Sequence, residues 1–303
     1  MKDTKSLSSK IFYIVVYAIM IILLFVTIYP IWYSLINSLN SASDINKKGY
    51  ALLWVRDFTW SSWKAVLNDS EILSAFWITT SRTILVTILQ LIVTSMFAYG
   101  FSRPYLKHKS FFKTIGLISM YLNGGIIAYF IMFYYIGIYN TYWVYILPFM
   151  FGGFYYVIIY NANFKAIPEA LFESAKLDGA SEFTIYARIV MPLSKPVLAA
   201  LAIFTASGTW NDYTVTLYYT VGKSLQTLPY YTLALIKSAA LSEALAEVTA
   251  GANSSLSQMA QQESNYKTIE LACMVLSALP LIIAYPFAQK YFESGIMVGS
   301  IKG

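Results

Sequence analysis

Apolar residues gather along this chain in six long stretches, separated by shorter polar connections. Each stretch is close to the roughly 20 predominantly apolar residues that an α-helix needs to cross a bilayer core. The spanning form must be helical because no water is available there to satisfy other backbone conformations. The pattern therefore predicts an all-α membrane protein with six transmembrane helices, at residues 11–36, 73–101, 112–136, 142–160, 197–219 and 266–285.

Composition agrees with a lipid environment. Hydrophobic residues make up 58% of the chain and charged residues 12%, against about 25% in an ordinary soluble domain. The first apolar run is longer than the 7–15 residues of a secretory signal core, so we expect it to remain as a permanent span.

The basic residues indicate the direction of insertion. A net charge of +6 could suggest nucleic acid, but these residues are spread over the connections, which fits a membrane topology and no nucleic-acid partner. With the N-terminus inside, thirteen lysines and arginines lie on the cytoplasmic side, seven lie outside, and Arg82 falls within the second span. We expect both termini to be cytoplasmic, with residues 1–10 and 292–303 as tails around a transmembrane domain at 11–291.

Two outer connections are long. Residues 37–70 contain Trp54, Trp60 and Trp63, which we expect to anchor the connection at the membrane surface rather than to build a site. The second connection, 221–265, has a polar stretch at 251–258 that is typical of a loop.

The cytoplasmic segment 165–192 predicts two short helices joined by a turn. Pro168 suits a first helical position, and Gly179 can take the left-handed conformation that ends a helix. Ser181 can cap the second helix, and Pro192 is expected to end it.

The same segment resembles the EAA loop of ATP-binding-cassette importer permeases, whose pattern is E-A-A, three residues, G, nine residues, then I-x-L-P. This chain has Glu173-Ser174-Ala175, Gly179 and Ile189-Val190-Met191-Pro192 at the full spacing. Ser174 and Met191 depart from the pattern by small or volume-conserving changes. The resemblance implies that Glu173, Ser174, Ala175, Asp178, Gly179, Ile189 and Pro192 couple the chain to an ATPase.

Other stretches are similar to the carbohydrate branch of these permeases, the MalG-like proteins. They are Thr209-Trp210-Asn211-Asp212-Tyr213, Leu225-Gln226-Thr227-Leu228-Pro229 and the C-terminal Gln289-Lys290-Tyr291-Phe292 with the glycines that follow. Residues 121–127 resemble the LplC/YtcP-type subgroup, in which proline often follows. Ala128 stands there instead, so we expect a weaker helix irregularity.

The resemblance implies a six-span type I ABC importer permease (MetI/MalG-like) fold in a bacterial cell membrane. Its implied partners are a homologous second permease subunit, two copies of a cytoplasmic ATPase, an extracytoplasmic solute-binding lipoprotein and a carbohydrate, namely an oligosaccharide. ATP and magnesium would be held by the ATPase, and this chain would hold no cofactor.

The sequence contains no complete catalytic motif. Gly222-Lys223-Ser224 resembles the end of a phosphate-binding loop, but Leu217 replaces its first glycine and the stretch lies on the outer side. His108 stands among lysines without a neighbouring carboxylate or cysteine, and no metal-ligand spacing occurs. We therefore expect neither enzyme activity nor a metal site.

Polar groups within the spans are candidates for the substrate pathway. Trp210, Asn211 and Asp212 combine a stacking ring with hydrogen-bonding groups, which suits a sugar; holding helices together is an equally weighted interpretation. Tyr121 and Asn123 are weaker candidates. Arg82 could snorkel outward or pair within the bundle.

Two rival functions remain open at this point. A secondary transporter driven by an ion gradient would need carboxylates in several spans, and only Asp212 clearly qualifies. A membrane scaffold for an ATPase would transport nothing, so a measured substrate flux separates it from both transporters.

Overall fold

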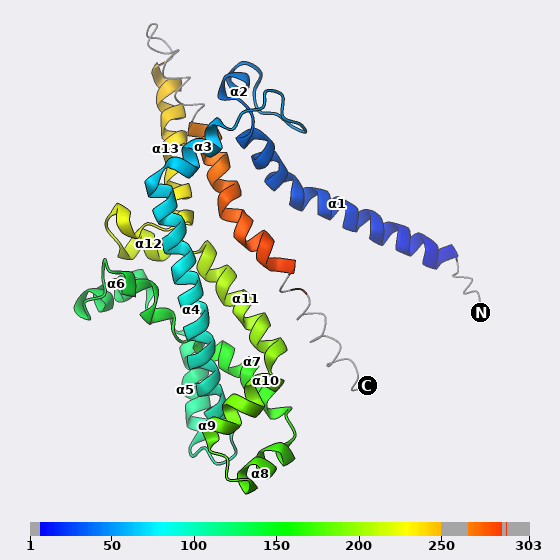
Figure 1. Cartoon of the computed structure of the whole chain (residues 1–303), viewed down its shortest axis with the longest axis vertical. Helices are drawn as coiled ribbons and strands as arrows, with labels where there is room; N and C mark the ends of the chain where they lie inside the picture. Colours follow the sequence, from blue (N-terminus) through cyan, green and yellow to red (C-terminus); the bar gives the residue numbers. More distant parts are fainter. Residues whose placement is uncertain (1–6, 250–265, 287–288, 290–303) are drawn as a thin grey trace. The chain divides into compact units, whose positions relative to one another are not determined.

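The computed structural model describes residues 7–249, 266–286 and 289, and in these ranges the chain is built of helices (Figure 1). The polar stretch 251–258 and the tail 292–303 lie outside the described residues. In chain order the elements are α1 (Leu7–Ser38), α2 (Ala42–Lys48), α3 (Ser61–Asn68), α4 (Ser70–Ser102), α5 (Lys109–Tyr121), α6 (Gly125–Tyr135), η1 (Tyr142–Tyr145), η2 (Leu147–Phe149), α7 (Gly153–Lys165), α8 (Glu169–Leu177), α9 (Glu182–Ile185), η3 (Tyr186–Val190), α10 (Met191–Leu193), α11 (Lys195–Asn211), α12 (Thr214–Tyr219), η4 (Lys223–Leu225), α13 (Leu228–Thr249) and a last helix, Tyr266–Pro286.

The chain divides into two compact units. The first consists of Met1–Ser70 and Thr232–Ala278, and the second of Glu71–Tyr231 and Leu279–Gly303. The first holds α1 and the short helices α2 and α3. The second holds the segment that resembles the coupling loop, together with nearly all of α4.

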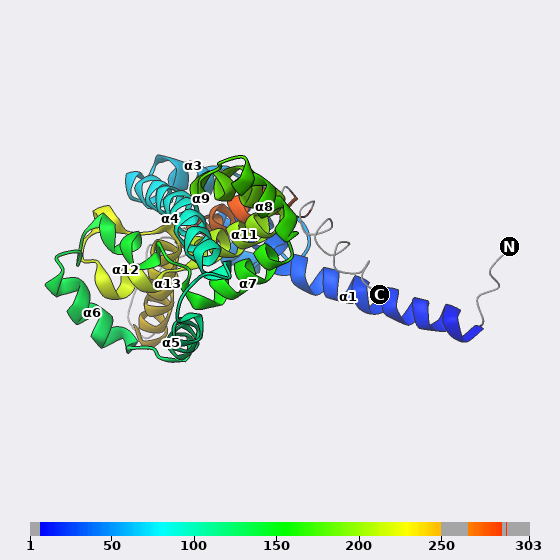
Figure 2. The same ribbon diagram turned by 90° about the horizontal axis from the view of Figure 1, so that it is seen from below.

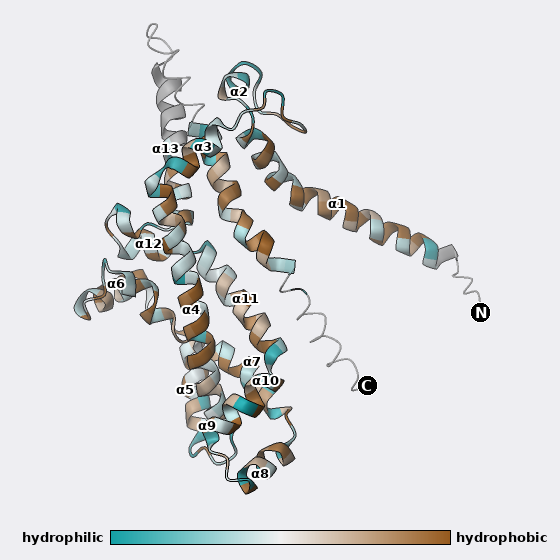
Figure 3. Cartoon of the chain, in the orientation of Figure 1, coloured by the Kyte–Doolittle hydropathy of each residue, from teal (hydrophilic) through white to brown (hydrophobic). Residues whose placement is uncertain are grey.

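Six membrane crossings can be assigned to the described helices. Ser9–Ser38, Ser70–Ser102 and Tyr266–Pro286 are each long and apolar enough to cross alone. Three further helix pairs qualify only when each bent pair is taken as one span, which gives the predicted total of six. Figure 3 shows the apolar character of α1 continuing along its length.

The third span is sharply broken, which corrects the expectation of a weak irregularity. Its two halves, α5 and α6, meet at 111°. Gly125 has φ +73°, a left-handed conformation that glycine adopts without a Cβ penalty, and its N–H donates to Asn123 Oδ1 at 2.9 Å. The break therefore comes from the Asn–Gly–Gly turn and needs no proline at Ala128.

The fifth span is also discontinuous, whereas the apolar run predicts one helix over 197–219. Helix α11 ends at Asn211, and Asp212 takes an extended conformation with ψ 120°. The carboxylate of Asp212 then accepts the N–H of Thr214 at 3.1 Å, at the start of α12. The break of the span thus coincides with a turn that the side chain of Asp212 closes.

The largest apolar cluster of the second unit joins membrane helices to the segment 165–192. The cluster draws buried residues from α4, α7, α8, α9, η3 and α11. Its members are Ala98, Tyr99, Phe101, Phe154, Val157, Tyr160, Phe164, Phe172, Ile185, Tyr186, Val190 and Leu201. The two short helices are consequently packed as part of the core.

Candidate functional site

Helix α8 ends as its sequence predicts, but it begins at Glu169, one residue after the predicted first helical position at Pro168. Pro168 precedes it at the cap position, with φ −56° and ψ 130°. At the other end Gly179 has φ +78°, its N–H donates to Lys176 O at 3.0 Å, and the N–H of Ala180 donates to Ala175 O at 2.9 Å. These two bonds form a Schellman motif, which satisfies carbonyls that the helix end leaves free. The turn after α8 is therefore fixed by glycine.

The second helix starts where predicted but does not stop at Pro192. Ser181 Oγ accepts the N–H of Thr184 at 3.2 Å and caps α9. The chain then widens into the π-helical turn η3, and Pro192 occupies an early position of α10, where its missing N–H is tolerated. The break falls at Ser194, after which α11 continues at 81°. The expectation that Pro192 ends the helix is therefore wrong.

The predicted coupling residues divide between surface and interior. Glu173, Ser174, Asp178, Gly179 and Pro192 are exposed, whereas Ala175 and Ile189 are half-buried against the apolar cluster. Leu177 is 89% exposed at the end of α8. An apolar tip and two carboxylates are thus available to a partner, while the small residue of the motif faces inward.

A buried ring attaches α8 to the C-terminal end of α4. Phe172 is 1% exposed, and the guanidinium carbon of Arg103 lies 3.9 Å from the centroid of its ring. Arg103 also lies over the ring of Tyr99, at 5.0 Å. Stacking of an arginine between two rings is favourable and geometrically restrictive.

Polar bonds tie α9 and η3 to the same helix. Tyr99 Oη donates to Glu182 Oε2 at 2.6 Å, and the hydroxyls of Ser95 and Tyr186 lie 2.7 Å apart. Lys176 pairs with Glu182 at 3.1 Å, but both side chains are almost half exposed, so this ion pair contributes little. Both views show α8 and α9 near the same end of α4 (Figure 1, Figure 2).

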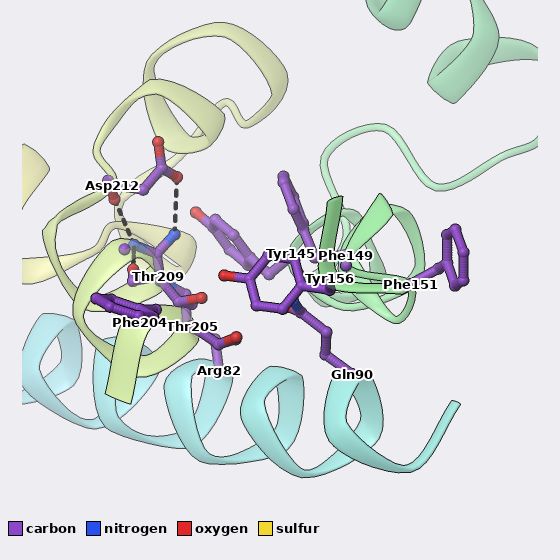
Figure 4. Close-up of a pocket in the computed structure, with 12 residues that line it drawn as sticks. Arg82, Gln90, Tyr145, Phe149, Phe151, Tyr156, Phe204, Thr205, Thr209 and Asp212 are labelled. Atoms are coloured by element: carbon purple, nitrogen blue, oxygen red, sulfur yellow. Dashed lines mark hydrogen bonds and ion pairs between the residues drawn. The ribbon is translucent and has the colours of Figure 1, made fainter. Parts of the chain in front are cut away.

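A cavity of about 360 Å³ opens within the second unit (Figure 4). Helix α4, the stretch from η1 to α7, and α11 all contribute to its wall. Its lining combines aromatic rings with a few hydrogen-bonding groups, which is typical of a ligand site. The lining residues are Arg82, Gln90, Tyr145, Phe149, Phe151, Gly152, Tyr156, Phe204, Thr205, Gly208, Thr209 and Asp212.

Arg82 lies at the cavity wall and is 1% exposed. It donates to Thr209 O at 2.6 Å and to Asp212 O, and it pairs with the Asp212 carboxylate at 3.4 Å. Its guanidinium carbon lies 5.1 Å from the ring centroid of Tyr145. Arg82 thus supplies charge and donors to the carboxyl end of α11, where a cation is favourable.

Two further polar atoms of the wall are buried without a hydrogen-bond partner in the described chain. They are Arg82 Nε and Thr205 Oγ1. Beside them Gly152 lets the Gln90 amide come close, because a Cβ on Gly152 would overlap that amide. A donor, a hydroxyl and an amide next to aromatic rings can together bind the hydroxyls and apolar faces of a sugar.

The predicted pathway residues separate in the structure. Asp212 lines the cavity, but Trp210 packs edge-to-face against Phe76, with ring centroids 6.0 Å apart, and Asn211 donates to Ser207 O at 3.0 Å. Neither Trp210 nor Asn211 is among the cavity's lining residues. Tyr121 and Asn123 lie at the break of the third span, and neither lines the cavity.

Sequence reasoning passed over most of the lining. A signal was present in α4, where Arg82, Gln90 and Thr94 follow one another at intervals of four or eight residues and so share a helix face. All three are buried. A polar row in an apolar span indicates a face turned toward protein or a cavity rather than toward lipid.

Metal binding finds no support among the described residues, where no group of three or more His, Cys, Asp or Glu could hold an ion. The single cysteine, Cys273, is buried. His108 is exposed at the start of α5.

Comparison with known proteins extends over nearly the whole chain. Residues 4–298 match the family described as binding-protein-dependent transport system inner membrane component. Protein LplC of Bacillus subtilis (strain 168) is 31% identical over 278 residues, covering 92% of this chain and 90% of that protein. The polygalacturonan/rhamnogalacturonan transport system permease protein YtcP of the same strain is 26% identical over 298 residues, covering 98% and 100%.

A solved structure agrees with the sequence matches. It is the crystal structure of a bacterial ABC transporter involved in the import of the acidic polysaccharide alginate. One of its chains superposes with a TM-score of 0.83 and 26% identity, covering 96% of this chain and 100% of that one.

Proposed function

This chain belongs to the family of inner membrane components of binding-protein-dependent transport systems, and on that premise we propose that it forms half of the translocation pathway of an ATP-driven carbohydrate importer. The other half is a homologous second permease subunit. Two copies of a cytoplasmic ATPase hold ATP and magnesium, and an extracytoplasmic solute-binding lipoprotein delivers the cargo. As a transport component the chain is no enzyme itself.

The observation that carries this proposal is the motif segment 165–192. Helix α8, which ends at Gly179, exposes the side chains of Leu177, Glu173 and Asp178 on the protein surface. Phe172 fixes the same helix to the end of α4 through Arg103. A stiff projection with an apolar tip and charged rim suits a cleft on another protein. We therefore assign this segment as the ATPase-coupling element.

Motion can pass from this element to the cavity through α4. When the ATPases close on ATP, α8 and α9 move with them, and the bonds at Tyr99 and Arg103 carry the end of α4 along. Arg82 lies further along the same helix and holds the end of α11. A displacement of α4 therefore changes the cavity wall, as alternating access requires.

The cargo we propose is an oligosaccharide. Relatives are named for polygalacturonan/rhamnogalacturonan and for arabinooligosaccharide transport. The cavity supports such a cargo because Tyr156 and Phe204 add aromatic rings to a wall that also contains Arg82, Thr205 and Asp212. In this proposal Asp212 belongs to the pathway, whereas Trp210 supports the helix that presents it.

We further propose a multi-pass placement in the bacterial cell membrane with both termini cytoplasmic. The permease domain comprises residues 11–291, and the tails comprise 1–10 and 292–303. The excess of basic residues on the coupling side supports this orientation.

Uptake by the reconstituted complex tests the energy source. Vesicles that contain the two permeases, the ATPase and the binding protein should accumulate labelled oligosaccharide with internal ATP after ionophores have collapsed all ion gradients. Uptake that depends on an ion gradient and is independent of ATP would contradict the proposal and support a secondary transporter. Such a transporter would need a free carboxylate, and Asp212 is already paired with Arg82.

Two substitutions at Gly179 test the coupling role. Gly179→Val should abolish most uptake while insertion persists, because a β-branched residue at φ +78° is strained by about 1–2 kcal/mol and distorts the end of α8. Gly179→Asn is the matched control, since asparagine tolerates this conformation and no atom lies within 4 Å of the added Cβ. Normal uptake by the valine variant contradicts the coupling role.

A further inference from the structure

The outer connection after α1 turns back along the helix that it has just left. Asn37 donates to Ala51 O at 2.8 Å and accepts the N–H of Ala51 at 2.7 Å. Lower on the helix, Trp32 Nε1 donates to Leu53 O at 2.9 Å. The chain then rises again, because the N–H of Asp57 donates to Asn40 Oδ1 at 2.8 Å. Residues 52–54, the outer tip, are therefore the deepest part of this connection.

The depth of the outer tip follows from helix geometry. Trp32 lies six residues before Ser38, which is about 9 Å along an α-helix. The span Ser9–Ser38 has 30 residues, or about 45 Å, against a hydrocarbon core of about 30 Å. A centred span extends about 7 Å beyond the core at each end. The outer tip then reaches the boundary between hydrocarbon and headgroups.

The side chains of the outer tip are apolar and uncovered within the chain. Leu52, Leu53 and Trp54 are 65%, 61% and 73% exposed. Trp54 also packs edge-to-face with Trp32, with ring centroids 6.0 Å apart. Tryptophan favours the boundary between hydrocarbon and water, so these rings suit the calculated depth.

The charged residues of the connection lie outside the stretch that carries the outer tip. No charged residue occurs between Lys48 and Arg56. Arg56 itself pairs with Asp44 at 2.7 Å, and Asn40 donates to Asp44 at 3.0 Å, a bond that lowers the pKa of that carboxylate. Side chains of α1 pair with both backbone groups of Ala51 and with the carbonyl of Leu53, which lowers the cost of placing these groups near hydrocarbon.

We propose that the outer tip inserts into the outer interfacial layer of the lipid bilayer, beside the outer end of α1. Of the three tryptophans expected at the surface, this role falls to Trp54. Trp63 instead is half-buried and donates to Ser38 Oγ at 3.1 Å. The apolar surface of the outer tip continues the apolar surface of α1, and the most apolar window of α1 has no buried residue. The inference requires α1 to span the membrane and is independent of the cargo.

Spin-label accessibility in the assembled transporter tests this proposal. The whole complex is reconstituted in phosphatidylcholine/phosphatidylglycerol vesicles, with Cys273→Ala as background and a nitroxide on Leu53→Cys. The expected result is a shift toward the lipid-facing pattern, with raised collision with oxygen and lowered collision with a water-soluble nickel chelate. Lys47→Cys serves as the exposed water reference, and Phe25→Cys as the reference within α1.

Two results overturn the proposal. Nickel collision equal to that at position 47 places the outer tip in water. Exclusion of both reagents means that another subunit or the binding protein covers it. If Leu53→Cys fails to assemble, Leu52→Cys answers the same question, and preserved ATPase activity verifies the fold in each case. Loss of ATP-driven uptake in the unsubstituted complex would affect the proposed function and leave the measured depth standing.

Discussion

Arg82 shows how one buried side chain can hold an interrupted span. It reaches the carbonyls of Thr209 and Asp212 as well as the Asp212 carboxylate, and it lies 1% exposed. Only a planar guanidinium can serve these acceptors together while it lies over the ring of Tyr145. The cation therefore replaces hydrogen bonds that α11 loses where it stops.

Replacing Arg82 tests this role. We expect Arg82→Gln to lower the stability of the complex by about 2 kcal/mol, because carbonyls and a carboxylate lose their donor while Asp212 remains partly exposed. Arg82→Lys should recover only part of the lost stability, since an ammonium cannot reproduce the planar set of donors of a guanidinium. Thermal unfolding in detergent measures both variants. Wild-type melting of Arg82→Gln would exclude the capping role.

The sequence indicated the two charged groups, Arg82 and Asp212, but not that they form an ion pair. Arg82 and Asp212 could each be recognised as unusual within a span. Their pairing joins residues 130 positions apart, and no local pattern encodes such a contact. For the same reason Thr205 and Tyr156 could not be assigned to the cavity, because packing brings them there.

Helix α8 separates two tasks that its sequence places within one turn and a half. Phe172 is buried under Arg103, whereas Leu177 is almost fully exposed. Phe172 therefore attaches the helix to this chain, and Leu177 is available to the proposed ATPase partner.

A pair of alanine substitutions should resolve these tasks. Phe172→Ala should cost about 3–5 kcal/mol and lower the melting temperature of the purified subunit. Leu177→Ala should leave that temperature unchanged and weaken co-purification of the ATPase. The two readouts are a melting curve and the ATPase-to-permease ratio. A reversed pattern, with Leu177→Ala unstable and Phe172→Ala fully assembled, contradicts the assignment.

Helices α5 and α7 pack closely because Gly116 has no side chain. A Cβ on Gly116 would fall within the ring of Phe154, which is only 5% exposed. We expect Gly116→Ala to destabilise the subunit by about 1–3 kcal/mol through overpacking.

Gly100 provides the control for this substitution. It lies within α4 and has no atom within 4 Å of an added Cβ, so Gly100→Ala should be neutral or stabilise by up to about 1 kcal/mol. Both changes are measured by thermal unfolding in the same detergent. Equal melting temperatures for the two variants would contradict the close contact of α5 with α7.

Elements governed by local chemistry were predictable, and elements governed by packing were not. Gly179 and Ser181 act through their own backbone neighbourhood, so the ends of α8 and α9 were correct. Pro192 was misjudged because the π-helical turn before it accommodates the missing N–H, and such a turn leaves no clear local signal.

At the scale of the whole molecule, the apolar pattern predicted six crossings because the demand for apolar length is set by the bilayer. The pattern could not reveal that the third and fourth crossings are bent, by 111° and 45°, or that the chain turns by 81° between residues 182–193 and α11. Those angles depend on glycines, caps and neighbouring helices rather than on hydropathy.

The proposed orientation is open to a direct test. In a Cys273→Ala background, Lys107→Cys should react with an impermeant maleimide only after the membrane is opened, whereas Lys47→Cys should react in intact cells. Both positions are exposed, so access to either depends on the side of the membrane alone. Labelling of position 107 from outside would invert the topology.

The wide turn η3 has a consequence for the number of residues between Gly179 and Pro192. Each α-helical residue turns the chain by about 100°, and a π-helical turn takes up one residue more than an α-helical one. Deleting a single residue from 186–190 would let the segment relax to ordinary α-helical winding without rotating the helices on either side of it. The wide turn thus absorbs one residue of the stretch between Gly179 and Pro192, and the exposed end of α8 would keep its direction if that stretch were one residue shorter.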